Sequence, residues 1–228
     1  MEEDLTKLTS EEVMQRSRAR QMALAIIRRG KDAKIPEQYL RIKEEKFKNI
    51  LAPDFHGDVA KFASSVYHDP DFLLNRKFIS IDGGTEQSRI IAGYALLFRM
   101  IAYDKVGMYC SCSEMYHKFQ TIKSTEEITR NDLTEQMKSY DILFISEFNR
   151  SLFSPHFETS SFFDEILGQR VNCSKPTIVS CVAPITKGSK DADAASGKSA
   201  SDAGKYLSRL ENIVATTDNV LRVRVKAV

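Results

Sequence analysis

The sequence has no tryptophan, and its 4 cysteines and 4 histidines follow no spacing typical of a metal site. Cys110 and Cys112 flank a single residue, which differs from the C-x-x-C spacing of a zinc knuckle. We therefore expect no metal. We interpret the cysteines as reduced thiols that line the core of a cytoplasmic protein.

Long apolar segments are also missing. No run reaches the ~18 residues that a membrane-spanning helix needs, so we expect no contact with a membrane. The chain begins with Met1 and three acidic residues, which is not typical of a secretory signal. The net charge of +2 is too small to indicate a nucleic-acid partner by itself.

The composition is that of a folded protein. Hydrophobic residues make up 42% of the 228 positions, enough for a packed core. The length suits one α/β domain with a short appendage. We place the boundary after residue 34, with a helical segment at 1–34 and the main domain at 35–228.

Residues 1–34 have the pattern of a helix. Thr9 and Glu12 fit a capping box at its start, and Gly30 is expected to end it. Its basic residues indicate either a solvated surface or a docking helix for a partner protein or for phosphates. The residues that we assign to docking are Arg16, Arg18, Arg20, Ile26 and Ile27.

Beyond residue 76 the pattern alternates between strands and helices. We expect strands at 77–82, 106–112, 141–146, 176–182 and 221–226, with helices between the first four. This alternation predicts a central parallel sheet covered by helices on both faces, in three layers. Residues 35–76 are interpreted as a connecting segment with a helix around 59–66, and 185–203 as a mobile loop before a short helix at 206–210.

The first strand leads into a glycine turn and a helix, which is the architecture of a phosphate-binding loop. Compared with the signature G-x-x-x-x-G-K-[ST], however, only Ser88 matches. Ile81 and Glu86 replace the two glycines, and Gln87 replaces the lysine. The third strand ends in Ser146-Glu147, where an active site of this kind has two acidic residues.

Several segments in the same order resemble the DnaC/IstB-type branch of the AAA+ ATPases, which contains helicase loaders and transposition helpers. They are the lead-in Ile35–Tyr39, the helix end Ile166–Arg170, the strand Lys175–Ser180 and the late segment Ala203–Leu210. The resemblance covers roughly residues 35–228. It implies a three-layer P-loop NTPase core of the AAA+ ASCE type, with degenerate Walker A and Walker B motifs.

The departures from that family concern its catalytic positions. Lys205 and Arg209 align with two late arginines, so we assign both to an arginine-finger-like position. The polar sensor residue of the family falls on Cys181 or Val182. The zinc-binding cysteines of one sub-branch have no counterpart at the N-terminus.

The substitutions predict a vestigial nucleotide site with weak or no binding of ATP and Mg²⁺. The site lacks the lysine that contacts the phosphates, and a hydroxyl cannot neutralise Mg²⁺ as a carboxylate does. Glu86 either takes the place of phosphate at the helix N-terminus or points to water. Glu147 occupies the place of a catalytic base, but it lacks a metal-bound nucleotide to serve, so we interpret it as a structural partner of a basic residue. The predicted vestigial residues are Gly83, Gly84, Thr85, Glu86, Gln87, Ser88, Ser146 and Glu147.

The resemblance implies a DNA replication accessory protein that binds the replicative helicase as a loader-like adaptor, without efficient ATP hydrolysis. Single-stranded DNA and other AAA+ subunits are further candidate partners. Mixed aromatic and basic groups are typical of single-strand binding, and here they are Tyr116, Lys118, Phe119 and Lys123. Two alternatives stay open: a phage or mobile-element factor that inhibits or diverts the helicase or its loader, and a divergent but active ATPase that assists transposition.

Overall fold

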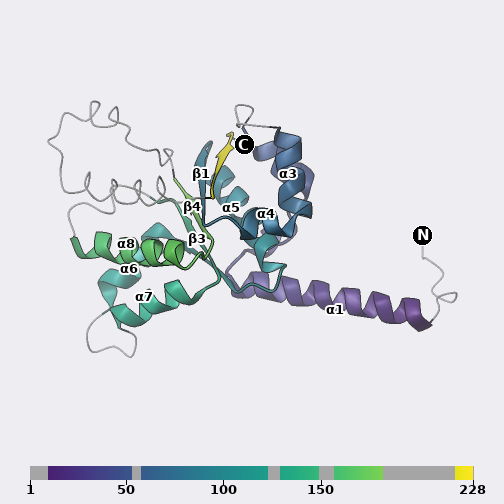
Figure 1. Cartoon of the computed structure of the whole chain (residues 1–228), viewed down its shortest axis with the longest axis horizontal. Helices are drawn as coiled ribbons and strands as arrows, with labels where there is room; N and C mark the ends of the chain where they lie inside the picture. Colours follow the sequence, from purple (N-terminus) through teal and green to yellow (C-terminus); the bar gives the residue numbers. More distant parts are fainter. Residues whose placement is uncertain (1–9, 53–57, 123–128, 149–156, 182–218, 228) are drawn as a thin grey trace.

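The computed structural model describes residues 10–52, 58–122, 129–148, 157–181 and 219–227 (Figure 1). Its centre is a parallel five-stranded sheet with the order β2-β3-β4-β1-β5. The strands are β1 (Phe78–Gly83), β2 (Gly107–Ser111), β3 (Ile142–Ser146), β4 (Thr177–Ser180) and β5 (Val220–Val225). All five expected strands are present, with their ends within two residues of the predicted positions. β4 lies between β1 and β3, as the predicted ASCE-type core requires.

Alternate residues of each strand enter two different hydrophobic cores, because successive side chains of a strand point to opposite faces. Ile79 and Ile81 of β1 belong to one core, and Phe78 belongs to the other. Phe144 and Ile145 of β3 divide in the same way. Both faces of the sheet are therefore buried, which confirms the predicted three layers.

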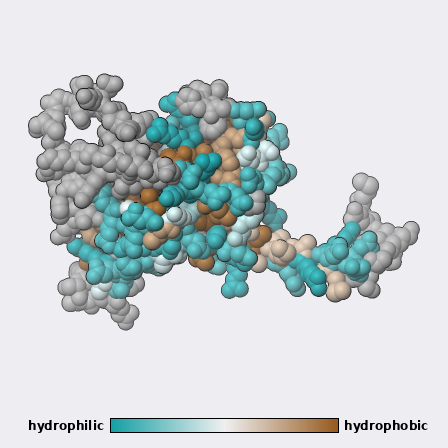
Figure 2. Space-filling view, in the orientation of Figure 1, coloured by the Kyte–Doolittle hydropathy of each residue, from teal (hydrophilic) through white to brown (hydrophobic). Residues whose placement is uncertain are grey.

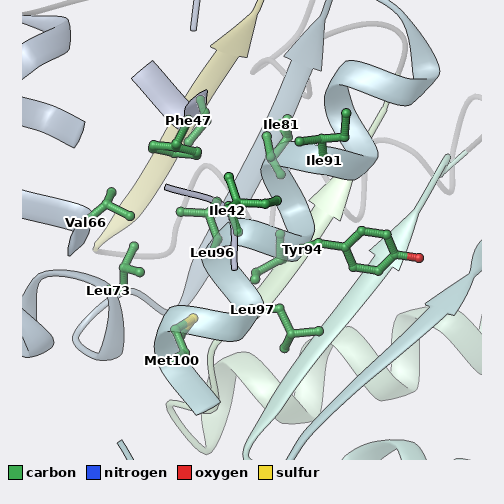
Figure 3. Close-up of a cluster of buried hydrophobic side chains, with 14 of the residues drawn as sticks. Ile42, Phe47, Val66, Leu73, Ile81, Ile91, Tyr94, Leu96, Leu97 and Met100 are labelled. Carbon is green, nitrogen blue, oxygen red and sulfur yellow. The ribbon is translucent and has the colours of Figure 1, made fainter. Parts of the chain in front are cut away.

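The first core lies between the sheet and the helices α2 (Glu44–Ile50), α3 (Val59–His68) and α5 (Glu86–Ile101). The helix α4 (Pro70–Leu74) and a short 3-10 helix, η2 (Glu37–Tyr39), complete this layer. Figure 3 shows the cluster around α5, in which Leu96 and Met100 of this helix belong to the same core as Phe47, Val66 and Leu73. The segment 35–76 thus holds more helices than the one that was expected.

The second core is covered by α6 (Cys112–Thr121), α7 (Arg130–Ser139) and α8 (Phe157–Asn172). In Figure 1 these three helices lie on the side of the sheet opposite α3. Cys110, Cys112 and Cys181 are buried free thiols, as predicted, whereas Cys173 is exposed. The expected mobile loop at 185–203 and helix at 206–210 lie outside the described residues.

The N-terminal helix α1 (Ser10–Asp32) extends from the body of the molecule as an arm (Figure 1). Only its last turns contact the core: a Cβ atom at Gly30 would lie 2.3 Å from Leu40 Cδ2, and the Tyr109 amide donates to the Ala33 carbonyl over 3.0 Å. The expectation that Gly30 ends the helix is wrong. The helix continues to Asp32, and Lys34 takes the left-handed conformation, with φ 61°.

Thr9, the expected N-cap of α1, lies outside the described residues. None of the described helices combines the length and the hydropathy needed to span a lipid bilayer.

Candidate nucleotide-derived site

The connection between β1 and α5 is short. β1 ends at Gly83 and α5 begins at Glu86, so that only Gly84 and Thr85 lie between them. A phosphate-binding loop is longer and directs several backbone N–H groups at its ligand. Here the carbonyl oxygens of Gly83 and Gly84 accept hydrogen bonds from Arg89 Nη1 over 2.9 and 3.2 Å.

Both glycines of the turn are required by the neighbouring C-terminal strand. Gly83 and Gly84 have positive φ angles of 80° and 51°, which other residues rarely adopt. A Cβ atom at Gly83 would lie 2.7 Å from the Val225 carbonyl oxygen, and one at Gly84 would lie 2.6 Å from that of Lys226. The close approach of β5 therefore accounts for these glycines without a phosphate.

The N-terminus of α5 is capped by its own side chains. Thr85 Oγ1 accepts a hydrogen bond from the Ser88 amide over 3.2 Å and lies 2.8 Å from Ser88 Oγ. Glu86 and Gln87 are exposed. Of the two alternatives for Glu86, the structure thus favours the one in which its carboxylate points to water. Gln87, which stands where the signature has a lysine, is likewise exposed to solvent.

The strongest interaction at this edge of the sheet joins Arg89 to Glu147. Arg89 Nε donates to Glu147 Oε1 over 3.0 Å, and Nη2 donates to Oε2 over 2.7 Å. The Arg89 side chain is 5% exposed and that of Glu147 is 21% exposed. Parallel hydrogen bonds between a guanidinium and a carboxylate are among the strongest polar contacts in proteins. The geometry agrees with the structural role that was predicted for Glu147.

Glu147 is held by β4 as well. Its amide donates to Ser180 Oγ over 2.9 Å, and that hydroxyl donates to Glu147 Oε1 over 3.1 Å. The backbone of Glu147 has a φ of 52°, a left-handed conformation that is uncommon outside glycine. The carboxylate is thus held in place by Arg89 and Ser180.

Sequence reasoning missed Arg89. It lies one residue beyond the Walker A alignment, at the start of a helix whose next positions are apolar. The available signal for this ion pair was an arginine beside an apolar stripe, together with an isolated glutamate after a buried strand. The separation of 58 residues between the partners gives no periodicity that would link them.

Ser146, at the position of the Walker B aspartate, is buried, and its Oγ lies 3.1 Å from the hydroxyl of Tyr109. The ring of Tyr109 packs edge-on against Tyr94 with a centroid distance of 4.8 Å. Burial, followed by the hydrogen bond with Tyr109, raises the pKa of Tyr94 far above its usual value. The Tyr94 phenol therefore stays neutral at physiological pH.

Taken together, these residues do not fit a magnesium nucleotide. The carbonyl oxygens of the turn accept hydrogen bonds from Arg89, this cation is already bound to Glu147, and the backbone of β5 fills the space beside the glycines. The Walker B position offers a neutral hydroxyl in place of the carboxylate that Mg²⁺ prefers. Within the described ranges, no group of three or more His, Cys, Asp or Glu side chains could hold a metal ion.

The arginines assigned to docking are exposed on the projecting part of α1. They do not share one face, because successive residues of a helix are rotated by about 100°. Arg16 and Arg20 lie on the same side, four residues apart, whereas Arg18 lies on the opposite side. Ile26 and Ile27 are half-buried, and Ile27 packs against the first core. Ile27 thus anchors the arm and is not available for docking.

The exposed apolar residues of the arm were not assigned to docking from the sequence. The side chains of Met14, Met22 and Leu24 are 56%, 67% and 57% exposed. Figure 2 shows apolar and hydrophilic residues mixed along the projecting helix. Single exposed apolar residues are common on protein surfaces, and the arm carries three of them.

Three of the four residues that were assigned to single-stranded DNA lie in the described chain, on α6. Phe119 is 6% exposed and packs on Phe162 with a centroid distance of 4.5 Å, so it belongs to the core and is not available to stack on a base. Tyr116 is half-buried, and Lys118 is exposed and pairs with Glu114. Lys123, Lys205 and Arg209 lie outside the described residues.

Solved structures with this fold include a DNA replication initiation factor and a helicase loader. A DNA replication initiation factor matches with a TM-score of 0.52 and 16% identity, over 76% of this chain and 48% of that one. A DnaC helicase loader matches with a TM-score of 0.51 and 12% identity, over 78% of this chain and 99% of that one. DnaI matches with a TM-score of 0.55 and 11% identity, over 85% and 92%.

The chain therefore has the fold of the P-loop AAA+ ATPases, which these three proteins share. The resemblance inferred from the sequence is confirmed at the level of the fold. The match spans about half of the initiation factor but nearly the whole of the DnaC and DnaI chains. No family model and no curated protein matches the sequence.

Proposed function

We propose that this chain is a DNA replication accessory protein, a helicase-loader-like adaptor that binds a replicative helicase through α1 without efficient ATP hydrolysis. The observation that carries the proposal is the combination of a DnaC/DnaI-like core with a helix that extends from it. The proposal keeps the domain boundary after residue 34, with the helical segment as the docking element.

The arm has the chemistry of a binding helix. Five arginines and no acidic residue occur between positions 14 and 29. The partner surface should therefore be acidic around apolar contacts that receive Met14, Met22 and Leu24. Electrostatic complementarity of this kind accelerates association, and the buried apolar side chains supply most of the affinity.

The direction of the exposed side chains supports this interpretation. Ile26, Ile27 and Gly30 mark the side of α1 that faces the core, and Ala19 and Ala23 continue that side along the arm. At about 100° per residue, Met14 lies on the opposite side, whereas Leu24 lies between the two sides, about 60° from Ile27. Packing against the chain's own core does not account for them, whereas a partner does.

The Arg89–Glu147 pair argues against the alternative of a divergent active ATPase. In this pair Arg89 binds Glu147, the only acidic residue left at the Walker B position. A factor that inhibits or diverts the helicase would use the same arm and the same inactive core. Such a factor therefore differs from a loader in its effect on helicase activity and not in the surface through which it binds.

The proposal is tested with the full chain and the replicative helicase of the same host, by measuring the Kd of the complex. Changing Met14 and Leu24 together to Ser should weaken binding at least tenfold, because both side chains would lose apolar contacts. Gln21→Ser is the matched control on the same exposed part of α1. Wild-type affinity in the double variant contradicts docking through this side.

An unwinding assay on a forked DNA then separates the two roles. Stimulation of helicase activity by the wild-type chain supports loading. Inhibition by the wild type, lost in the double variant, supports diversion.

A further inference from the structure

The Arg89 guanidinium links the glycine turn and the adjoining start of α5 to two segments that are distant in sequence. It contacts the carbonyl oxygens of the glycine turn, extends from the first turn of α5 and binds the carboxylate after β3. Through Glu147 it also reaches Ser180 at the end of β4. All four segments meet at the carboxyl edge of the parallel sheet, where open α/β folds bind their ligands.

A magnesium nucleotide would join the same segments in a working P-loop protein. Its phosphates bind the turn and the helix N-terminus, and its metal is held near the acidic end of the third strand. In this chain a single arginine makes the corresponding connections with the opposite charge. In the turn, carbonyl oxygens bind the arginine, whereas a phosphate would need amides.

We infer that the Arg89–Glu147 pair is an internal replacement for the nucleotide, which holds the core permanently in one state. The described partners of the two side chains satisfy both Glu147 oxygens and all three Arg89 nitrogens. The connections between turn, helix and strands are therefore present without ligand.

This arrangement has a consequence for the arm. α5 carries Arg89 in its first turn and Phe98 near its end, and Phe98 Cε2 lies 3.1 Å from the Cβ position of Gly30 on α1. A nucleotide that moved α5 would thereby change the position of α1. With the pair in place, α1 is displayed in the same way whether or not nucleotide is present. This consequence rests on the proposed function of α1, whereas the pair itself does not.

Thermal unfolding of the full chain tests the pair. Arg89→Met should lower the Tm by about 5–10 °C, because it leaves a mostly buried carboxylate without its cation. Glu147→Met should also lower the Tm. In the double variant the two losses should not add, and the Tm should recover toward the better single variant because no charge is left without a partner. Losses that simply add would overturn the inference.

Addition of ATP and Mg²⁺ to the wild-type chain distinguishes a nucleotide replacement from an ordinary ion pair. We expect a Tm shift below 1 °C at millimolar nucleotide, whereas a ligand present at a hundred times its Kd would raise the Tm by about 5 °C or more. A shift of that larger size would also overturn the inference.

The Kd for the helicase completes the test. It should be the same within a factor of two with and without ATP and Mg²⁺. If the chain binds no helicase with or without nucleotide, the proposed role of α1 is refuted. The inference on the Arg89–Glu147 pair is then decided by the Tm measurements alone.

Discussion

Arg170 Nε donates a hydrogen bond to Thr177 Oγ1 over 2.9 Å, and both side chains are at most 1% exposed. Burial lowers the pKa of Arg170 to about 10, so that the guanidinium remains charged at neutral pH. It lies among backbone carbonyls that come from the end of α7, the residues before β3 and the residue before β4. Its carbonyl partners are those of Met137, Lys138, Tyr140, Asp141 and Pro176.

Arg170→Met should lower the free energy of unfolding by about 3 kcal/mol, because several buried carbonyls would lose their donor. Chemical denaturation monitored by circular dichroism measures this loss. Arg18→Met, on the exposed part of α1, is the matched control and should change stability by less than about 0.5 kcal/mol. An equal loss of unfolding free energy in the two variants would show that the hydrogen bonds of Arg170 do not stabilise the fold.

Gly93 is required by the packing of α5 on the sheet. A Cβ atom at this position would lie 2.0 Å from Phe144 Cζ. Gly93→Ala should therefore destabilise the chain by about 1–3 kcal/mol, since the buried ring has little room to move. Combining it with Phe144→Leu should restore part of the loss in the same denaturation assay, because the leucine leaves space for the new methyl group. An uncompensated double variant would argue against this contact.

Glu114 joins the end of the arm to α6. The hydrogen bond from Lys34 Nζ, 3.1 Å long, lowers the pKa of Glu114 more than its partial burial raises it, and Lys118 adds to the lowering. Because the pKa is lowered in the folded state, this carboxylate stabilises the fold above its usual pKa of 4.5, and the contribution is lost as the pH falls through the lowered value.

Lys34→Ala should raise the pKa of Glu114 toward 4.5, which an NMR titration of the side-chain carboxyl carbon can follow. In the wild type, the stability difference from Glu114→Gln should shrink as the pH falls below that value. Lys46→Ala, at an exposed position on α2, serves as control. A pKa of Glu114 that is unchanged in Lys34→Ala would contradict the contact.

The proposed contact with single-stranded DNA divides the α6 residues into two classes. Tyr116→Ser and Lys118→Gln should weaken binding of an oligonucleotide, by roughly tenfold for the loss of one base stack, and should lower its salt dependence only in the lysine variant. Phe119→Leu should lower stability by about 1 kcal/mol and leave the DNA affinity of the folded protein unchanged. Fluorescence anisotropy at several salt concentrations measures these effects, and unaltered affinity in both surface variants removes α6 as the contact.

Much of the fold could be predicted from the sequence, because strand and helix patterns are local. The run Ile142–Ile145 is apolar at every position and is buried on both faces of the sheet, as expected for a central parallel strand. Patterns of this kind located all five strands. The helices α2 and α4 were missed because they are short, with seven and five residues, and offer too few turns for a clear period.

The candidate site was only partly predictable. Gly83, Gly84 and Ser88 could be located by their spacing after the first strand, and the loss of the lysine and of the second acid was visible directly. The role of Phe119 was misjudged, since an aromatic residue on a helix has the same sequence signal in a core as at a nucleic-acid surface. Its contact with Phe162 depends on how α8 packs against α6.

By itself, the sequence determined the order of strands and helices and the absence of a standard nucleotide signature, because both follow from residue types at close spacing. Only the tertiary structure decided that Arg89 would meet Glu147, that β5 would lie against the two glycines, and that Met14 and Leu24 would remain exposed. These relationships depend on which strands become neighbours in the sheet and on how α1 leaves it. Such long-range packing has no period in the sequence from which it could be inferred.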